Sequence, residues 1–268
     1  GGGSLVLANQ FGNTTPRDGT IFGLFNSGMV TTPLLNPGAV HFDPRRLRFL
    51  GSPNREGHVY IARDNAPAKT IDEILTKELM VGGTAPGAAP YEFPLVMNAL
   101  VGTRMKMIPG YGGSGPIMLA MERGELHGYA GLAWVSAKQG YLQQIQQGKV
   151  LVVAQFGMKK HPDLPDTPLM PLGRTEEDRQ LFQLLYARQS FGRPFAFPPD
   201  TPEYLVAALR KAMAALTRDA EFLAEAKKLN ADIDLVTGEE LEALTDSLYA
   251  TPAPLLARIR ALINPEAR

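Results

Sequence analysis

The sequence predicts an α/β protein with mostly parallel sheets flanked by helices. Apolar strand segments alternate with amphipathic helical segments through the middle of the chain, at 79–83, 91–100, 104–108, 114–123, 126–130, 134–147 and 150–155. Turns of small residues, such as Gly83-Thr84 and Gly112-Gly113, connect a strand to the next helix. This alternation is typical of parallel strands joined by helical crossovers. Because such crossovers align the carboxyl ends of the strands at one edge, a ligand is expected there.

Boundary signals predict the elements that precede this alternation. Ser4 is a suitable N-cap for a short helix at 5–11, and a strand is expected at 20–25. The loop Asn26-Ser27-Gly28 then leads into a helix that ends at Leu35. The N-terminal part is therefore expected to contribute one strand between two helices.

The remaining elements follow from the same kinds of signal. Further strands are expected at 48–51, 59–62 and 191–197. A helix is expected to begin at Thr70, where Thr70-Ile71-Asp72-Glu73 has the capping-box pattern. Further helices are expected at 175–188, 201–217, 219–229, 238–248 and 252–263. The last third of the chain is thus predicted to be largely helical.

Composition excludes several classes of function. The chain has 268 residues, of which 44% are hydrophobic and 20% charged, as in a globular protein. Lys and Arg together number 27, as do Asp and Glu, so the net charge is zero. This balance argues against a nucleic-acid partner or an anionic membrane surface. The absence of cysteine rules out thiol catalysis, disulfides and cysteine-based zinc sites.

The turn that follows the strand at 79–83 is the strongest candidate for a binding site. Backbone N–H groups at a helix N-terminus have no helical partner, and the helix macrodipole favours negative charge there. The N–H groups of Gly83, Thr84, Gly87 and Ala88, with the Thr84 hydroxyl, are therefore predicted to bind an anion such as a carboxylate or phosphate. The alternative is a tight turn that needs small residues only for packing.

Two further turns are weaker candidates. Asn26 and Ser27 follow a predicted strand and are expected to contact the ligand, or else to cap the next helix. Tyr111 and Gly112 belong to a second strand-to-helix turn, in which Tyr111 is expected to cover the ligand and Ser114 could be only an N-cap. In each case the two roles are compatible, since a helix start is also an anion site.

Three larger side chains have two interpretations each. Trp134, the single tryptophan, follows a predicted strand and is a candidate ligand contact, although burial in the core is the commoner role. Arg188 precedes the predicted strand at 191–197, and Arg193 lies near its start. A guanidinium there could hold a carboxylate in bidentate fashion or form a salt bridge.

No pattern in the chain indicates catalysis. The sequence contains no Gly-x-Ser-x-Gly elbow, Walker loop or His-Glu-x-x-His motif. The four histidines are scattered, with no pair at helical spacing that would bind a metal. We therefore expect no catalytic residue, no metal and no cofactor.

Several short motifs follow one another along nearly the whole chain. They are Gly2-Gly3-Ser4 with Ala8-Asn9, Thr15-Pro16-Arg17-Asp18-Gly19, residues 83–90, Tyr111-Gly112-Gly113-Ser114 and His161-Pro162-Asp163-Leu164-Pro165. Each motif alone is modest. Their order and spacing together resemble the extracytoplasmic solute receptors of tripartite tricarboxylate transporters, the Bug or TctC-like binding proteins.

The resemblance implies a two-domain clamshell of the periplasmic-binding-protein type. Domain one would comprise residues 1–63 and 189–268, and domain two residues 64–188, with two crossing hinge strands near 58–63 and 189–195. A small organic carboxylate would bind between the domains, and the closed form would meet a membrane permease. A periplasmic location, a monomer and the absence of enzymatic activity are further implications.

The chain also departs from the family pattern. Family members have a strand, a Gly-rich turn and a helix before the position that matches Gly1. Domain one is therefore expected to lack a strand and part of the ligand shell. Two rival interpretations remain open: an α/β enzyme acting on a carboxylated or phosphorylated metabolite, and the effector-binding domain of a regulator.

Overall fold

The computed structural model describes residues 5–264 and divides the chain into two compact units. The first unit comprises Gly1–Glu56 and Ala187–Pro252, and the second comprises Gly57–Tyr186 and Ala253–Arg268. The domain boundaries expected from the sequence, after residues 63 and 188, differ from these. Strand β3 (His58–Arg63) lies in the second unit because it pairs on both sides with strands of that unit. Helix α12 (Ala253–Ile263) lies there because it packs on helix α4.

The first unit is built on a four-stranded sheet with the order β1-β8-β2-β9, in which every pairing is antiparallel. The strands are β1 (Gly23–Leu24), β2 (Arg48–Ser52), β8 (Phe195–Phe197) and β9 (Val236–Thr237). The helices are α1 (Leu5–Asn13), α2 (Thr32–Leu35), α8 (Arg188–Phe191), α9 (Glu203–Leu216), α10 (Ala220–Lys228) and α11 (Gly238–Tyr249). Three short 3-10 helices are η2 (Ser27–Met29), η3 (Pro37–Ala39) and η4 (Pro44–Arg46). Helix α9 packs on the sheet through a small cluster around Leu50, Phe197 and Val206.

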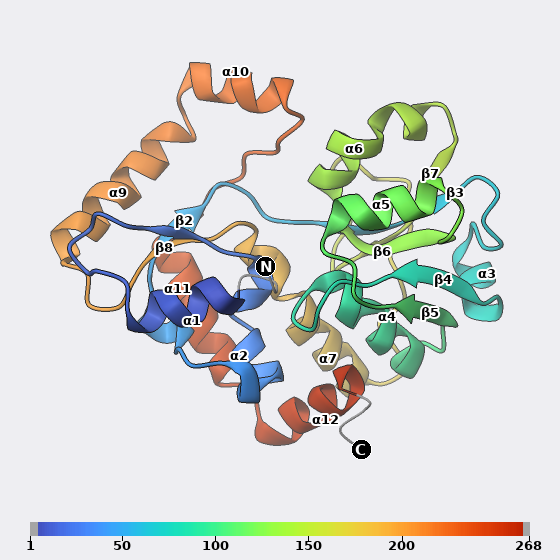
Figure 1. The fold of residues 1–268 in the computed structure, drawn as a ribbon, viewed down its shortest axis with the longest axis horizontal. Helices are drawn as coiled ribbons and strands as arrows, with labels where there is room; N and C mark the ends of the chain where they lie inside the picture. The colour runs from blue at the N-terminus through green and yellow to red at the C-terminus, as the bar shows by residue number, and fades with distance from the viewer. Residues whose placement is uncertain (1–4, 265–268) are drawn as a thin grey trace. The chain divides into compact units, whose positions relative to one another are not determined.

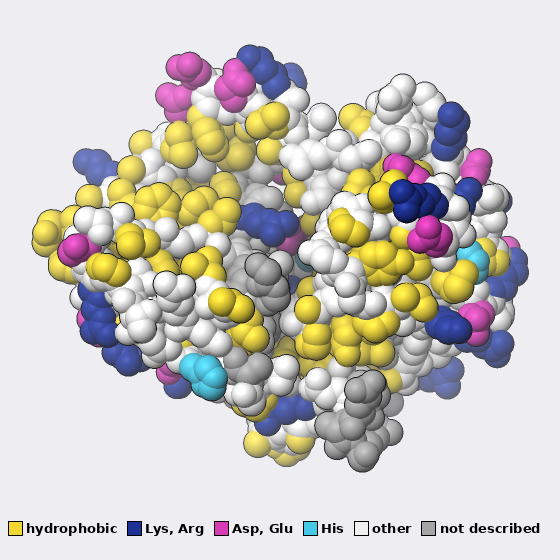
Figure 2. Space-filling model, in the orientation of Figure 1, with side chains coloured by type: hydrophobic (Ala, Val, Ile, Leu, Met, Phe, Trp, Pro, Cys, Tyr) yellow, Lys and Arg dark blue, Asp and Glu magenta, His cyan; other side chains and the backbone are white. Residues whose placement is uncertain are grey.

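The apolar surface of the first unit is not fully covered. Ile21, Phe22 and Leu24 are exposed beside β1, which is an edge strand of the sheet. Tyr204 and Leu216 are exposed on α9, where Figure 2 shows a broad area of hydrophobic side chains. An exposed apolar sheet edge is a template for further pairing.

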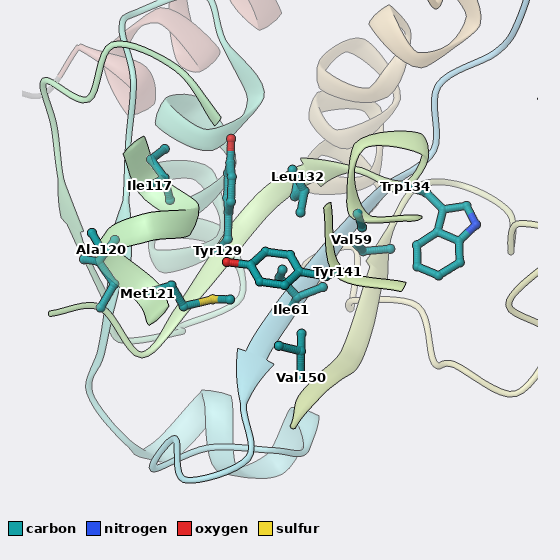
Figure 3. Close-up of a cluster of buried hydrophobic side chains, with 12 residues drawn as sticks. Val59, Ile61, Ile117, Ala120, Met121, Tyr129, Leu132, Trp134, Tyr141 and Val150 are labelled. Carbon is teal, nitrogen blue, oxygen red and sulfur yellow. The ribbon is translucent and has the colours of Figure 1, made fainter. Parts of the chain in front are cut away.

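The second unit is built on a five-stranded sheet with the order β5-β4-β6-β3-β7. Its strands are β3, β4 (Leu79–Gly82), β5 (Met105–Ile108), β6 (Gly128–Ala133) and β7 (Val150–Phe156). Its helices are α3 (Ile71–Thr76), α4 (Ala89–Leu100), α5 (Ser114–Glu122), α6 (Trp134–Gln146), α7 (Glu176–Tyr186) and α12. Helices α5 and α6 cover one face of the sheet, and α4 covers the other, with α12 against it (Figure 1). The core beneath α5 and α6 is drawn in Figure 3.

The α/β fold with helices flanking two open sheets is confirmed, but the strand directions need correction. The parallel pairings are β4 with β5 and β4 with β6. Strand β3 runs antiparallel to both of its neighbours, and the sheet of the first unit is antiparallel throughout. The alternation of strands and helices predicted the crossovers correctly. It did not give the direction of β3, which was predicted as a strand at 59–62, because β3 precedes the alternating segment and pairs with the more distant strands β6 and β7.

Three predicted elements are shorter than expected. The strand at 20–25 is reduced to β1, which pairs with the three-residue strand β8. The helix expected to end at Leu35 is divided into η2 and α2. The strand at 191–197 begins only at Phe195, because α8 extends to Phe191 and is followed by Gly192, whose φ is +53°. The predicted N-cap Ser4 and the motif residues Gly2 and Gly3 lie outside the described residues.

No helix in the described part of the chain has the length and apolar character that crossing a membrane requires.

Helix α11, which packs on β2, begins with a complete capping box. The Thr237 hydroxyl accepts the Glu240 N–H at 3.2 Å, and the Glu240 carboxylate accepts the Thr237 N–H at 2.8 Å. Replacing Thr237 by Ala is expected to lower the free energy of unfolding by about 1 kcal/mol, because one N–H loses its partner. Urea unfolding followed by circular dichroism measures this loss. Thr237→Ser, which keeps the hydroxyl, is the control, and equal stability of the two variants would contradict the role of the cap.

Candidate functional site

The carboxyl ends of β4 and β5 lie side by side at one edge of the sheet of the second unit, because Gly82 lies opposite Ile108. Strand β6 runs in the same direction but extends further, since Val81 lies opposite Gly128, the first residue of β6. Strand β4 is followed by the predicted anion turn, β5 by the turn that contains Tyr111, and β6 by Trp134 at the start of α6. The two predicted turns of this unit therefore lie side by side, whereas the start of α6 lies further along, at the end of the longer strand β6 (Figure 1).

Backbone hydrogen bonds join the two turns directly. The Gly83 N–H donates to the Ile108 carbonyl at 2.7 Å. The N–H of Gly110 donates to the Thr84 carbonyl at 3.2 Å, and that of Tyr111 donates to the Gly83 carbonyl, also at 3.2 Å. The parallel pairing of β4 and β5 thus continues into the turns. It brings Gly83 and Thr84 beside Tyr111 and so unites two candidates that were predicted separately.

Most of the predicted donors in the first turn already have partners within the chain. The Gly83 N–H is bound to Ile108, and the Ala88 N–H donates to the Ala85 carbonyl at 3.2 Å. The Gly87 N–H donates to the Glu92 carboxylate at 3.0 Å. Thr84 differs, because neither its N–H nor its hydroxyl makes a hydrogen bond with any residue in 5–264. Of the four predicted residues, Thr84 is the one with free donors for a ligand.

Glu92 is a residue of this turn that the sequence-based reasoning missed. It lies in the first turn of α4 and is only 2% exposed. A carboxylate is favoured at this position by the helix macrodipole and by the N–H that it accepts. The Glu92 side chain therefore already occupies part of the predicted anion site at 83–88. Glu92 could have been found from the sequence as an acidic residue within about one helical turn of Ala88, the N-cap of α4.

The second turn has more free donors. Among the residues that the structure describes, the N–H groups of Gly112, Gly113, Ser114 and Gly115 have no hydrogen-bond acceptor. These groups lie at the N-terminus of α5, where the macrodipole is positive. A side chain built at Gly112, Gly113 or Gly115 would meet no atom within 4 Å. The space beside this turn is therefore open to a ligand.

Trp134 is buried, as the alternative interpretation required. It is 6% exposed and belongs to the core cluster of Figure 3. Its indole N–H donates to the Asp163 carboxylate at 2.9 Å, and the Lys138 ammonium lies 2.8 Å from the same carboxylate. These hydrogen bonds, from Lys138 first and then from Trp134, lower the pKa of Asp163 below its ordinary value. That Trp134 contacts the ligand stays a prediction, but its indole N–H already donates to Asp163.

Asn26 and Ser27 of the first unit lie in a separate polar cluster. The Asn26 side chain accepts the Gly28 N–H at 2.9 Å and thereby caps η2. The Ser27 hydroxyl donates to the Glu56 carboxylate at 3.4 Å, and the Arg193 guanidinium lies 2.8 Å from the other Glu56 oxygen. Burial raises the pKa of Glu56, while the charge of Arg193 opposes that shift. The structure therefore has the salt bridge that was the second interpretation of Arg193, and ligand contacts of Asn26 and Ser27 stay predictions.

Comparison with known proteins supports the fold independently. No protein-family model matches the sequence, and no curated protein matches it significantly. The structure is similar to that of the periplasmic binding protein BugD, with 21% identity, a TM-score of 0.71, and coverage of 100% of this chain and 84% of that one. It is also similar to MatC from Rhodopseudomonas palustris with bound malate, with 18% identity, a TM-score of 0.70, and coverage of 98% and 85%.

A third similar structure is a protein of R. palustris with adipate, with 16% identity, a TM-score of 0.72, and coverage of 97% of this chain and 84% of that one. At these identities the similarity establishes the fold. The chain has the fold of the Bug-type periplasmic binding proteins, as its sequence motifs predicted.

Proposed function

We propose that this protein is an extracytoplasmic receptor that binds a small organic carboxylate and passes it to a membrane transporter of the tripartite tricarboxylate type. The observation on which the proposal rests is the open turn at the N-terminus of α5, with its free N–H groups at Gly112, Gly113, Ser114 and Gly115. Proteins of the same fold with bound malate and with adipate support a carboxylate as the ligand class.

The proposed chemistry needs no cationic side chain. The ligand carboxylate would accept hydrogen bonds from the N–H groups of the second turn and from the nearby Thr84 hydroxyl. A helix N-terminus carries about half a positive charge, and hydrogen bonds to a charged group contribute about 1.5–3 kcal/mol each. Glu92 would disfavour a carboxylate at the first turn, so the ligand is placed at the second.

We propose that the protein binds its ligand and catalyses no reaction on it. The similar structures include a protein described as a periplasmic binding protein, and an enzyme is not favoured. A periplasmic location, a permease partner and a monomeric state are parts of the same proposal. The location is supported by a similar structure that is described as periplasmic, and the other two rest on the resemblance of the sequence motifs alone. The ligand within the carboxylate class is to be identified by experiment.

Calorimetric titration of the protein with malate and with adipate tests the ligand class. A ligand at 100 times its dissociation constant should also stabilise the fold by about 2.7 kcal/mol in a thermal unfolding measurement. A protein that is folded by circular dichroism and binds neither these nor other small carboxylates would refute the receptor function.

Replacing Gly115 by Asp tests the location of the site. Gly115 is the second residue of α5 and its side-chain position is open, so the new carboxylate fits the helix N-terminus without cost to stability. It should compete with the ligand for the same N–H groups and weaken carboxylate binding at least about ten-fold, or about 1.4 kcal/mol. The neutral control Gly115→Asn should weaken binding far less. Equal affinities of the two variants would place the ligand elsewhere.

A further inference from the structure

We propose that Tyr129 is a positioning residue of the carboxylate site, and that its hydroxyl acts through Ser114 to hold the glycine-rich turn in its binding conformation. This inference rests on the proposed function, because it concerns the same turn. Tyr129 is on β6 and is not expected to touch the ligand itself.

The contact between Tyr129 and Ser114 joins the turn to the core of the second unit. The two hydroxyl oxygens are 3.0 Å apart. Tyr129 is 2% exposed and packs in the core cluster beneath α5 (Figure 3). Ser114 is the first residue of α5 and is exposed. The phenol is therefore a rigid support, and its hydroxyl reaches the start of the helix.

The turn needs such a support because its glycines provide none. Gly112, Gly113 and Gly115 have no side chains, and the space around their Cα atoms is open. Glycine has the largest conformational freedom of any residue, so an unsupported run of glycines loses much entropy when a ligand orders it. The glycine-rich segment 112–115 lies between two anchored residues. Tyr111 before it packs against the core, and Ile117 after it is buried. Between them, Ser114 makes the side-chain hydrogen bond to the sheet.

A second tyrosine provides a matched control. Tyr141 lies on α6, is buried in the same cluster, and donates its hydroxyl hydrogen to the Met118 carbonyl at 2.9 Å. Met118 is on α5, about one helical turn beyond Ser114. Tyr129→Phe and Tyr141→Phe therefore each remove one hydroxyl that contacts α5. The first contact supports the turn and the second supports only the helix.

The experiment measures both ligand affinity and the order of the turn. Titration uses malate or adipate, whichever the unmodified protein binds, with Tyr129→Phe and Tyr141→Phe in the full chain. Tyr129→Phe should weaken binding about five-fold, the loss that corresponds to one hydrogen bond between uncharged groups. Tyr141→Phe should change affinity less than about two-fold. Ser114→Ala should match Tyr129→Phe, and combining the two should cause no further loss.

Amide relaxation of Gly112, Gly113 and Gly115 by NMR reports on the turn without any ligand. Their order parameters should fall in Tyr129→Phe and remain unchanged in Tyr141→Phe. Unchanged affinity in Tyr129→Phe, or equal weakening in both variants, would overturn the inference. If the unmodified protein binds no carboxylate, the proposed function fails by itself. Lower order parameters in Tyr129→Phe alone would then still support the role of Tyr129 in holding the turn, and unchanged values would overturn it.

Discussion

Replacing Gly192 by Ala is expected to lower the free energy of unfolding by about 3–5 kcal/mol, through strain and overpacking together. Gly192 follows α8 with a φ of +53°, a conformation that L-residues with a side chain rarely adopt. A methyl group there would overlap the Asn54 carbonyl oxygen and would lie 2.8 Å from the Ser52 hydroxyl. Neither group can move easily, because the Ser52 hydroxyl donates to that carbonyl at 2.8 Å and accepts the Arg193 N–H at 2.9 Å.

Urea unfolding followed by far-ultraviolet circular dichroism measures the effect of Gly192→Ala. Gly148→Ala is a suitable control, since Gly148 also has a positive φ, of +70°, but its side-chain position is open. The control should lose only the strain contribution, about 1–2 kcal/mol. A loss in Gly192→Ala no larger than in Gly148→Ala would mean that the segment at 52–54 moves aside, and that the overlap has little energetic effect.

Replacing Asp178 by Ala is expected to destabilise the second unit by about 3 kcal/mol. Asp178 is 5% exposed and lies in the first turn of α7. One carboxylate oxygen accepts the N–H groups of Arg174 and Thr175 at 3.0 and 3.1 Å, and the other accepts from the Arg258 guanidinium of α12 at 2.6 Å. Removing the carboxylate leaves the two N–H groups and one arm of the Arg258 guanidinium without their acceptor and weakens the link between α7 and α12.

The fluorescence of Trp134 measures the effect of Asp178→Ala in the relevant unit. Trp134 is the single tryptophan of the chain and is buried in the second unit. In Asp178→Ala, the unfolding transition that this fluorescence follows should move to lower urea concentration. Glu177→Gln is the control, because Glu177 also contacts Arg258, at 2.8 Å, but is exposed. An exposed ion pair contributes less than about 1 kcal/mol, so equal losses in the two variants would contradict the role of Asp178.

The contribution of Asp178 to the free energy of unfolding should also depend on pH. The hydrogen bond from the Arg174 N–H is the main cause that lowers the pKa of Asp178 in the folded protein. An unfolded Asp has a pKa of about 3.9, so the stabilisation is complete above that pH and is lost as the pH falls through the lower pKa of the folded state. The stability difference between the unmodified protein and Asp178→Asn should therefore be full at neutral pH and should shrink below about pH 4.

Local features of the structure could be predicted from the sequence because their causes are local. The turns that end β4 and β5 were found from small residues between an apolar strand and an amphipathic helix. The Asn26 cap was found from residue type and position, and so was the helix that begins after Thr70, whose side chain accepts the Glu73 N–H. Each of these features depends on residues within about one helical turn of one another.

Features that depend on distant partners could not be predicted in the same way. Strand β3 lies between β6 and β7, although about 65 residues separate it from β6 in the chain, and nothing in its own sequence sets its direction. Arg193 had two interpretations, and only the structure shows its salt bridge with Glu56. The indole of Trp134 is turned into the core, with its N–H on Asp163, by packing that involves several elements.

The sequence by itself determined where strands pass into helices, which turns are rich in small residues, and which kind of protein the chain resembles. Only the tertiary structure decided which N–H groups remain free for a ligand. In the first turn, Gly83 donates to Ile108 of a neighbouring strand, and Gly87 donates to Glu92, which packing buries. The second turn keeps its donors because no acceptor from 5–264 lies over its glycines. A backbone donor is identical in every residue except proline, so its availability depends on its surroundings and not on its own identity.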